Sequence, residues 1–151
     1  MRSYAQGTSV SVDRSKAEIE AILRRYGADG FGHYQKGDRA EVCFEIVGKP
    51  FRIDIPMPSQ KDFAVTEKGR KRVESQVDAE YEKECRRRWR AICLVLKAKL
   101  ELIYMGASTI EKEFMLHMVL DNGSTVQEKL LPHINEIVKA DKIGKFLSAP
   151  E

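Results

Sequence analysis

A chain of 151 residues that is 42% hydrophobic and 32% charged has the size and composition of one soluble domain. Its three cysteines, Cys43, Cys85 and Cys93, form no CxxC pair, so the sequence indicates no disulfide framework and favours a reducing cytoplasm. The longest nearly uncharged apolar run, residues 91–96, is far shorter than the roughly 20 residues of a membrane span, and the N-terminus lacks a signal-peptide pattern. We therefore expect a single cytoplasmic domain over residues 1–151.

The net charge of +3 is unevenly distributed along the chain. Residues 1–67 carry 10 basic and 10 acidic side chains, residues 68–99 carry 11 and 5, and residues 100–151 carry 5 and 8. A central segment of +6 beside a mildly acidic C-terminal segment predicts one face that attracts anions. The alternative is an ordinary solvated helix surface.

Residues 1–58 are predicted to form a helix followed by a β-meander. Residues 8–12 alternate in polarity and favour a short edge strand. Asp13 is the expected N-cap of a helix that continues from Arg14, with apolar residues at helical spacing, and Gly27 is expected to end that helix.

Three antiparallel strands are expected next. Residues 40–46 and 51–55 alternate cleanly, and a turn at Gly48-Lys49 would place Ile46 opposite Phe51 and Glu45 opposite Arg52. Residues 31–35 are expected to join through a turn at Lys36-Gly37. The first helix is available to cover the apolar side of this sheet. Pro56 and Pro58 should end the sheet and begin an exposed connector.

Residues 66–106 are predicted to be a long helical segment. One apolar stripe recurs at steps of three and four and belongs to an amphipathic helix; it comprises Cys85, Trp89, Ile92, Cys93, Leu96, Leu100 and Ile103. Gly106 should end this helix. The polar residues 70–84 are either a solvated extension of the helix or a separate short helix. Trp89, on the stripe, is expected in the core.

Residues 108–144 are predicted to contain the C-terminal helices. Ser108-Thr109-Ile110-Glu111 is a capping-box pattern, and residues 121–123 form a turn. Two alternatives remain for residues 118–126, which either form a small hairpin or lead to a helix capped by Ser124. In the last helix, Pro132 is expected to bend or divide the chain. The whole layout is α+β: an N-terminal helix on a three-stranded antiparallel sheet, then a helical half with one long amphipathic helix.

Basic residues provide the most suggestive candidate site. Arginine offers a rigid fork of donors that suits phosphate oxygens, and helical spacing brings several of these cations onto one face. The candidate residues for binding nucleic acid or a partner are Arg70, Lys71, Arg72, Arg86, Arg87, Arg90 and Lys97.

The sequence indicates no catalytic, metal or cofactor site. His33, His117 and His133 have no metal-ligand spacing, and no cysteine lies at ligand spacing from them. His33 and Cys43 are expected on opposite sheet faces, which rules out a nucleophile and base pair. No glycine-rich phosphate loop is present. The pattern favours a protein without enzymatic activity.

The chain resembles a group of small uncharacterised bacteriophage and prophage proteins with no assigned activity. The matching segments are Tyr4-Ala5, Thr8 to Val12, Ser15 to Ile19, Tyr26-Gly27-Ala28, Pro56-Met57-Pro58, Gly69-Arg70-Lys71-Arg72, Arg86 to Leu100, and Ser108-Thr109 through Pro132. The resemblance covers most of the chain and carries over no functional residue. It implies a phage origin and a role in the cytoplasm of the host cell.

Two functions are then expected of a protein in such a setting. The first is a non-enzymatic accessory protein that contacts DNA or RNA phosphates through the basic helix face. The alternative is an inhibitor of a bacterial host defence system that acts by binding a host protein. The stripe from Cys85 to Ile103 is long enough to serve both a core and a dimer seam, which favours a homodimer.

Overall fold

The structure is a computed structural model that describes residue 5 and residues 7–137. Helix α1 (Val12–Arg25) precedes an antiparallel sheet in the order β1-β2-β3, and long helix α2 (Glu74–Tyr104) follows it. The remaining elements are β1 (Ala28–Lys36), β2 (Arg39–Ile46), β3 (Lys49–Pro56), η1 (Gln60–Phe63), α3 (Ile110–Phe114), η2 (Met115–His117), α4 (Val126–Leu130), η3 (Leu131–His133) and α5 (Ile134–Ile137). The predicted α+β class is confirmed.

The N-cap of α1 is Ser11, not Asp13. Ser11 has extended backbone, and its hydroxyl accepts the N–H of Arg14. Asp13 instead lies in the first turn, where its carboxylate interacts favourably with the positive end of the helix dipole. The predicted strand over residues 8–12 is wrong, because the Thr8 hydroxyl accepts the N–H of Val10 and the chain leads directly into the cap. Gly27 follows the helix with φ 87°, as its predicted role requires.

The β2–β3 hairpin is confirmed, but its predicted register is wrong by two residues. The turn is Val47-Gly48, where both residues have positive φ (52° and 67°), so Phe44 lies opposite Phe51. Two-residue turns with positive φ at both positions match the twist of a hairpin. Because side chains alternate with a period of two, a shift of two residues leaves every side chain on its predicted face of the sheet. The residues predicted to face the core and those predicted to face outward are therefore unchanged.

Two details of the meander also differ from prediction. Arg52 lies opposite Cys43 and not opposite Glu45, as a result of the two-residue shift. The β1–β2 turn is Gly37-Asp38, one residue later than expected, because Lys36 still pairs with Arg39.

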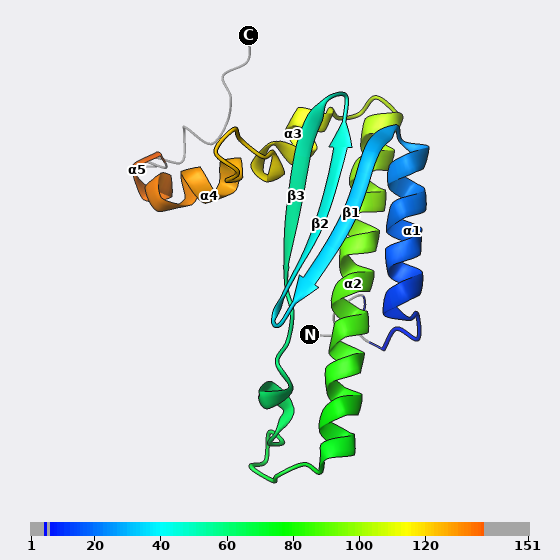
Figure 1. Ribbon diagram of the computed structural model, residues 1–151, viewed down its shortest axis with the longest axis vertical. Helices are drawn as coiled ribbons and strands as arrows, with labels where there is room; N and C mark the ends of the chain where they lie inside the picture. The colour runs from blue at the N-terminus through cyan, green and yellow to red at the C-terminus, as the bar shows by residue number, and fades with distance from the viewer. Residues whose placement is uncertain (1–4, 6, 138–151) are drawn as a thin grey trace, which may run out of the picture.

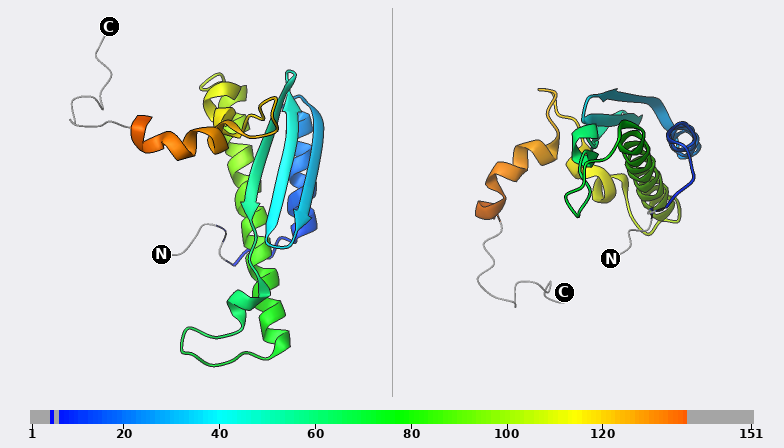
Figure 2. Two further views of the ribbon diagram at one scale, coloured as in Figure 1. Left: turned by 60° about the vertical axis from the view of Figure 1, so that its left-hand side comes forward. Right: turned by 90° about the horizontal axis from the view of Figure 1, so that it is seen from below.

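Helix α2 covers the apolar face of the sheet. Figure 2 shows α2 beneath the strands and α1 beside it, at the β1 edge. The buried residues of α2, which we call the core stripe, are Cys85, Trp89, Cys93, Leu96 and Leu100. Helix α1 contributes to the same core as expected: it packs mainly on α2 and also on β1, and its Ile19 and Leu23 are buried there.

Trp89 is fully buried, as predicted. The ring of His33 meets it edge-on at 6.1 Å between centroids, and the Lys16 ammonium lies 4.7 Å from its centroid. These contacts place β1, α1 and α2 around one side chain, which makes Trp89 the junction of the three layers.

Helix α2 is continuous from Glu74, which settles the open choice for its polar part. Residues 74–84 form an extension of the long helix that projects past the sheet (Figure 1), and residues 70–73 precede it. The connector after β3 contains η1, closed by a capping box between Ser59 and Asp62. Met105 and Gly106 end α2, as predicted.

Of the two alternatives for residues 118–126, the small hairpin is confirmed and the cap at Ser124 is wrong. Val119 and Thr125 pair as a small hairpin, and Thr125, not Ser124, caps α4 in a capping box with Glu128. Met118 also bridges to Phe51, so this hairpin extends the sheet at the β3 edge. The buried ring of Phe114 in α3 packs against the rings of Phe44 in β2 and Phe51 in β3.

The segment from α4 to α5, residues 126–137, is here called the arm. Pro132 lies in η3 and divides the predicted last helix into two short helices, as expected. Figure 1 shows the arm projecting away from the sheet and α2. Its large apolar residues Leu130, Leu131 and Ile134 are exposed. The remainder of the predicted C-terminal helices, residues 138–144, lies outside the described residues.

The core stripe predicts a sharp contrast between neighbouring residues of α2. Leu96→Ala removes a fully buried side chain and should lower the free energy of unfolding by about 2–5 kcal/mol. Val95→Ala, on the exposed side, should change it by less than about 0.5 kcal/mol. Urea unfolding followed by circular dichroism measures both, and equal losses would contradict the assignment of faces.

Candidate nucleic-acid interface

The predicted basic residues occupy two separate places in the structure. Arg70, Lys71 and Arg72 lie in the loop before α2, whereas Arg86, Arg87, Arg90 and Lys97 lie on α2 itself. At a rise of 1.5 Å per residue, Arg86 is about 18 Å along the axis from the start of the helix. One compact site containing all seven cations therefore does not exist.

In the loop group, Arg72 has a structural role. Its guanidinium donates to the carbonyls of Phe63 and Val65, both at 3.0 Å, and its backbone N–H donates to Ala64. Lys71 bridges to Val65 through the backbone, and the side chains of Arg70 and Lys71 are exposed. Arg72 thus closes the loop, and Arg70 and Lys71 remain available to a ligand.

On α2, each candidate arginine pairs with a carboxylate. Arg86 lies 3.9 Å from Glu82 and Arg87 lies 3.2 Å from Glu84. These pairs are partly exposed and lie within one helix, so each stabilises the protein by about 0–1 kcal/mol. Because arginine has five N–H donors, a paired arginine still has donors for a phosphate. The pairs therefore leave Arg86 and Arg87 able to bind an anion.

Arg90 differs from its neighbours because its partner is in another helix. Its guanidinium lies 2.5 Å from the Glu18 carboxylate of α1, and both side chains are largely covered. Further along the same junction, the Tyr26 hydroxyl donates to Glu101, and this hydrogen bond raises the pKa of Tyr26. Arg90 therefore holds α1 against α2, and its replacement would disturb the fold as well as any ligand.

The predicted grouping on one helix face is consistent with α2 geometry. At 100° per residue, Arg86, Arg90 and Lys97 lie within about 40° of one another, on the side of α1. Arg87 lies about 60° further from the core stripe. Of the +6 charge of residues 68–99, Lys68, Arg70, Lys71 and Arg72 in the loop contribute +4, and residues 74–99 of α2 contribute +2. Glu18 and Glu101 offset that +2, so α2 offers individual paired cations to an anion, and the net positive charge lies in the loop.

The opposite side of α2 carries a second apolar stripe that the sequence analysis missed. Its residues, here called the back stripe, are Ala91, Val95, Ala98, Leu102 and Met105. They follow a 4-3-4-3 spacing typical of helix pairing, and Val95, Leu102 and Met105 are exposed. The spacing was readable in the sequence, but the core stripe of the same helix masked it.

The outer face of the sheet is polar and holds ordinary ion pairs. Asp54 accepts from Arg39 at 3.0 Å and lies 3.8 Å from Arg52. Arg52 also donates to the Gly123 carbonyl and to Glu128, both at 2.9 Å, which ties the base of the arm to β3. These contacts use the charges for structure, and they supply no acid and base pair for catalysis.

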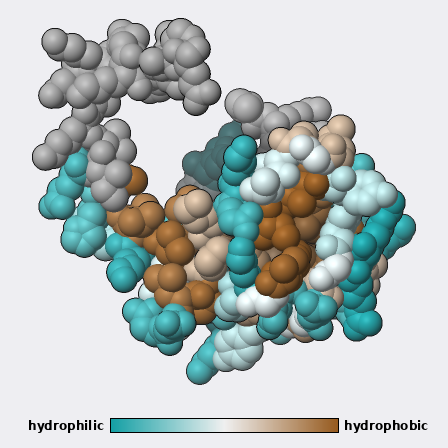
Figure 3. Space-filling model, turned by 90° about the horizontal axis from the view of Figure 1, so that it is seen from above, coloured by the Kyte–Doolittle hydropathy of each residue, from teal (hydrophilic) through white to brown (hydrophobic). Residues whose placement is uncertain are grey.

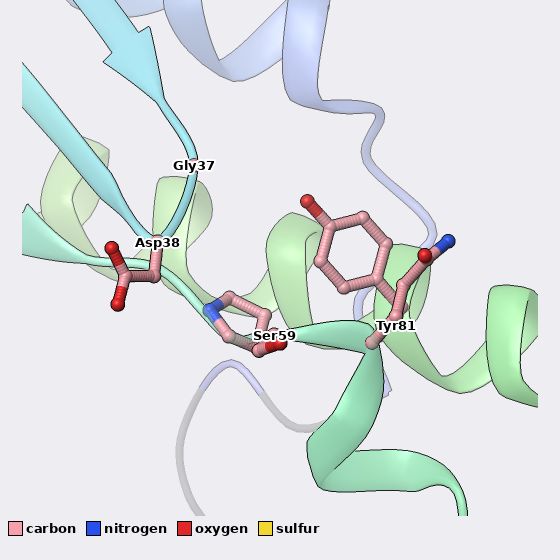
Figure 4. Close-up of a pocket in the computed structure, with 6 residues that line it drawn as sticks. Gly37, Asp38, Ser59 and Tyr81 are labelled. Carbon is pink, nitrogen blue, oxygen red and sulfur yellow. The ribbon is translucent and has the colours of Figure 1, made fainter.

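A cavity of about 540 Å³ lies between the β1–β2 turn and α2 (Figure 4). The Asp38 carboxylate points away from Tyr81 in this view. Inside the cavity wall, Gln60 donates to Asp78, and Ser59 caps η1. A hydrogen bond with Cys85 raises the pKa of Tyr81. Gln60, Ser59 and Tyr81 are thus engaged with their own neighbours, and the Asp38 carboxylate points away from Tyr81.

Among residues 5 and 7–137, no group of three or more His, Cys, Asp or Glu side chains is placed to hold a metal ion. Cys43 is on the outer sheet face and His33 packs on Trp89 at the inner face, as predicted. In the same part of the chain, no helix is both long and apolar enough to cross a membrane.

Comparison with protein-family models, curated proteins and solved structures finds no match to this chain.

Burial raises the pKa of all three cysteine thiols, which predicts slow alkylation of the folded protein at neutral pH. Cys43 is half-buried, so it should be the first of the three to react with iodoacetamide, at a lower rate than the reference thiol glutathione. Cys85 and Cys93 are buried and should react only when concentrated urea unfolds the protein. Mass spectrometry of the labelled peptides measures the order. A fast reaction at Cys85 or Cys93 in the folded protein would contradict it.

Proposed function

We propose that this protein is a non-enzymatic accessory protein that binds nucleic-acid phosphates through the basic face of α2 and the loop before it. The observation that carries the proposal is the charge of residues 68–99, which stays at +6 with every carboxylate of the segment counted. The loop before α2 carries +4 of this charge at Lys68, Arg70, Lys71 and Arg72, and residues 74–99 of α2, a helix about 46 Å long, carry the remaining +2. The proposal includes a phage origin, in which such a protein handles nucleic acid after infection.

The arrangement fits contacts with the backbone of a nucleic acid, not reading of bases. The cations lie at two places about 20 Å apart, and the outer sheet face offers Tyr34 as its exposed aromatic. Sequence-specific single-strand recognition uses several stacked aromatics. Binding by phosphate contacts alone depends strongly on salt and weakly on sequence.

A charge-removal experiment tests this proposal. The triple variant Arg86→Ala, Arg87→Ala, Lys97→Ala keeps Arg90 and its Glu18 contact, so the α1–α2 junction stays intact. Fluorescence anisotropy with labelled single-stranded DNA, duplex DNA and RNA should show salt-dependent binding by the wild type. In the variant, the slope of log affinity against log salt should fall by about 2.7 on a duplex, which is about 0.9 for each phosphate contact.

The matched control removes three cations elsewhere: Arg24→Ala, Arg39→Ala and Lys112→Ala. Arg24 has an exposed i,i+4 pair with Glu20 that resembles the pairs on α2. If both triple variants bind equally well, the basic face is not the binding surface. Absence of binding by the wild type at low salt would reject nucleic-acid contact altogether.

A second candidate function, inhibition of a bacterial host defence system by binding a host protein, is favoured by the back stripe. This exposed apolar line is flanked on the α1 side by Arg87, Arg90 and Lys97. Such a surface suits an amphipathic helix with acidic residues beside its apolar face.

Capture from nuclease-treated host lysate tests this second function. A host protein that the wild type retains should be lost with the double variant Val95→Glu, Leu102→Glu, which places charges on the back stripe. The matched control variant Arg24→Ala, Arg39→Ala, Lys112→Ala should still retain it. Retention of the same protein by the back-stripe variant would contradict docking at this surface.

A further inference from the structure

The end of the molecule where α2 terminates carries an apolar groove. Two cavities, of about 380 and 300 Å³, lie on either side of Ile103 and Ile110 and together are here called the end groove. Tyr26, Ile46 and Tyr104 line the larger cavity, and Val47 lines the smaller one. A cavity of about 150 Å³ already admits a small aromatic molecule. The end groove therefore has room for more than one bulky apolar side chain.

Val47 at the rim of this groove is held in a backbone conformation that valine disfavours. Its φ is 52°, and a β-branched residue is a clear outlier in this region. Glycine, asparagine or aspartate would fit the turn better. The Val47 side chain is nonetheless 75% exposed, so no contact within the fold repays the strain. An apolar contact outside the chain would account for valine at this position.

The arm presents the complementary feature. Leu131 is 54% exposed, and Leu130 and Ile134 are exposed beside it. Helices of four and five residues are not stable by themselves in water. Yet the direction of the arm is fixed, because the capping box of Thr125 and the Arg52–Glu128 pair anchor its base. An anchored arm with an exposed apolar surface requires something to pack against.

The arm and the end groove share one face of the molecule. Figure 3, viewed from above, shows hydrophobic side chains at the centre of this end and along the arm to the left. The arm projects away from the chain's own groove (Figure 1), so a single chain does not join the two. A second copy supplies both a groove for this arm and an arm for this groove.

We propose that the protein forms a symmetric dimer in which the arm of each copy lies in the end groove of the other. Twelve arm residues and the thirteen residues that line the two cavities give each partner about 25 interface residues. Stable interfaces use roughly 20–30 residues on each side. Arg25 at the groove and Glu136 near the tip of the arm are exposed charges of opposite sign. The proposal does not depend on nucleic-acid binding.

Exchange of arms predicts a specific pattern of complementation. Sedimentation equilibrium of the full chain at tens of micromolar should show a dimer for the wild type. Leu131→Glu in the arm and Tyr104→Lys in the groove should each weaken the dimer by at least tenfold, because each destroys both contacts. Both residues are exposed, so the fold should persist. Mixing the two variants should give heterodimers that are tighter than the dimers of either variant alone, because one of the two arm–groove contacts is intact in the mixed pair.

Two further variants separate the interface from effects on folding. Val47→Asn should weaken the dimer while raising the Tm of the dilute monomer by about 2–4 °C, since asparagine suits the turn. Val95→Glu, on the back stripe, changes a residue of comparable exposure and should leave the dimer intact. A wild-type monomer at tens of micromolar, a mixture whose dimers are no tighter than those of either variant alone, or a dimer disrupted by Val95→Glu would overturn the proposal.

Discussion

The burial of the core stripe of α2 against a three-stranded sheet is the constraint on which the rest of the structure depends. Three strands present an apolar face wide enough for one helix at its centre and part of a second at its edge. Trp89 lies at this junction and contacts His33 of β1 and Lys16 of α1. Because α2 is 31 residues long and the sheet covers only part of it, much of the helix surface faces outward. The basic residues and the back stripe are exposed for that reason.

Periodicity in the sequence predicted the elements well, because burial enforces it. The core stripe from Cys85 to Leu100 and the alternation in β2 and β3 follow directly from having one buried face. The hairpin register was predicted less well, since it depends on backbone angles at Val47 that valine disfavours. The N-cap residue of α1 was predicted wrongly for a related reason. Serine and aspartate are both good N-cap residues, and the backbone of the preceding turn selects Ser11 over Asp13.

The candidate site was only partly predictable. The basic residues are in the sequence, but the pattern of charges does not show which carboxylate each arginine meets. Arg72 turned out to hold a loop through two carbonyls, and Arg90 to join two helices through Glu18, a partner 72 residues away. Arg86 and Arg87, by contrast, meet carboxylates within the same helix, which the i,i+3 and i,i+4 spacing allows. Long-range partners of this kind appear only once the elements are packed.

The surface of the protein divides along the axis of α2, and the division bears on how its proposed activities combine. The apolar end groove lies where α2 ends, whereas Arg70, Lys71, Arg86 and Arg87 lie toward its start. A dimer formed through the groove end would therefore leave the basic residues of both copies uncovered. Two linked basic surfaces bind one long polyanion more tightly than either alone, because the second contact becomes intramolecular. Loss of the arm contact should then weaken binding to long nucleic acids more than to short ones, although the arm is not among the proposed phosphate contacts.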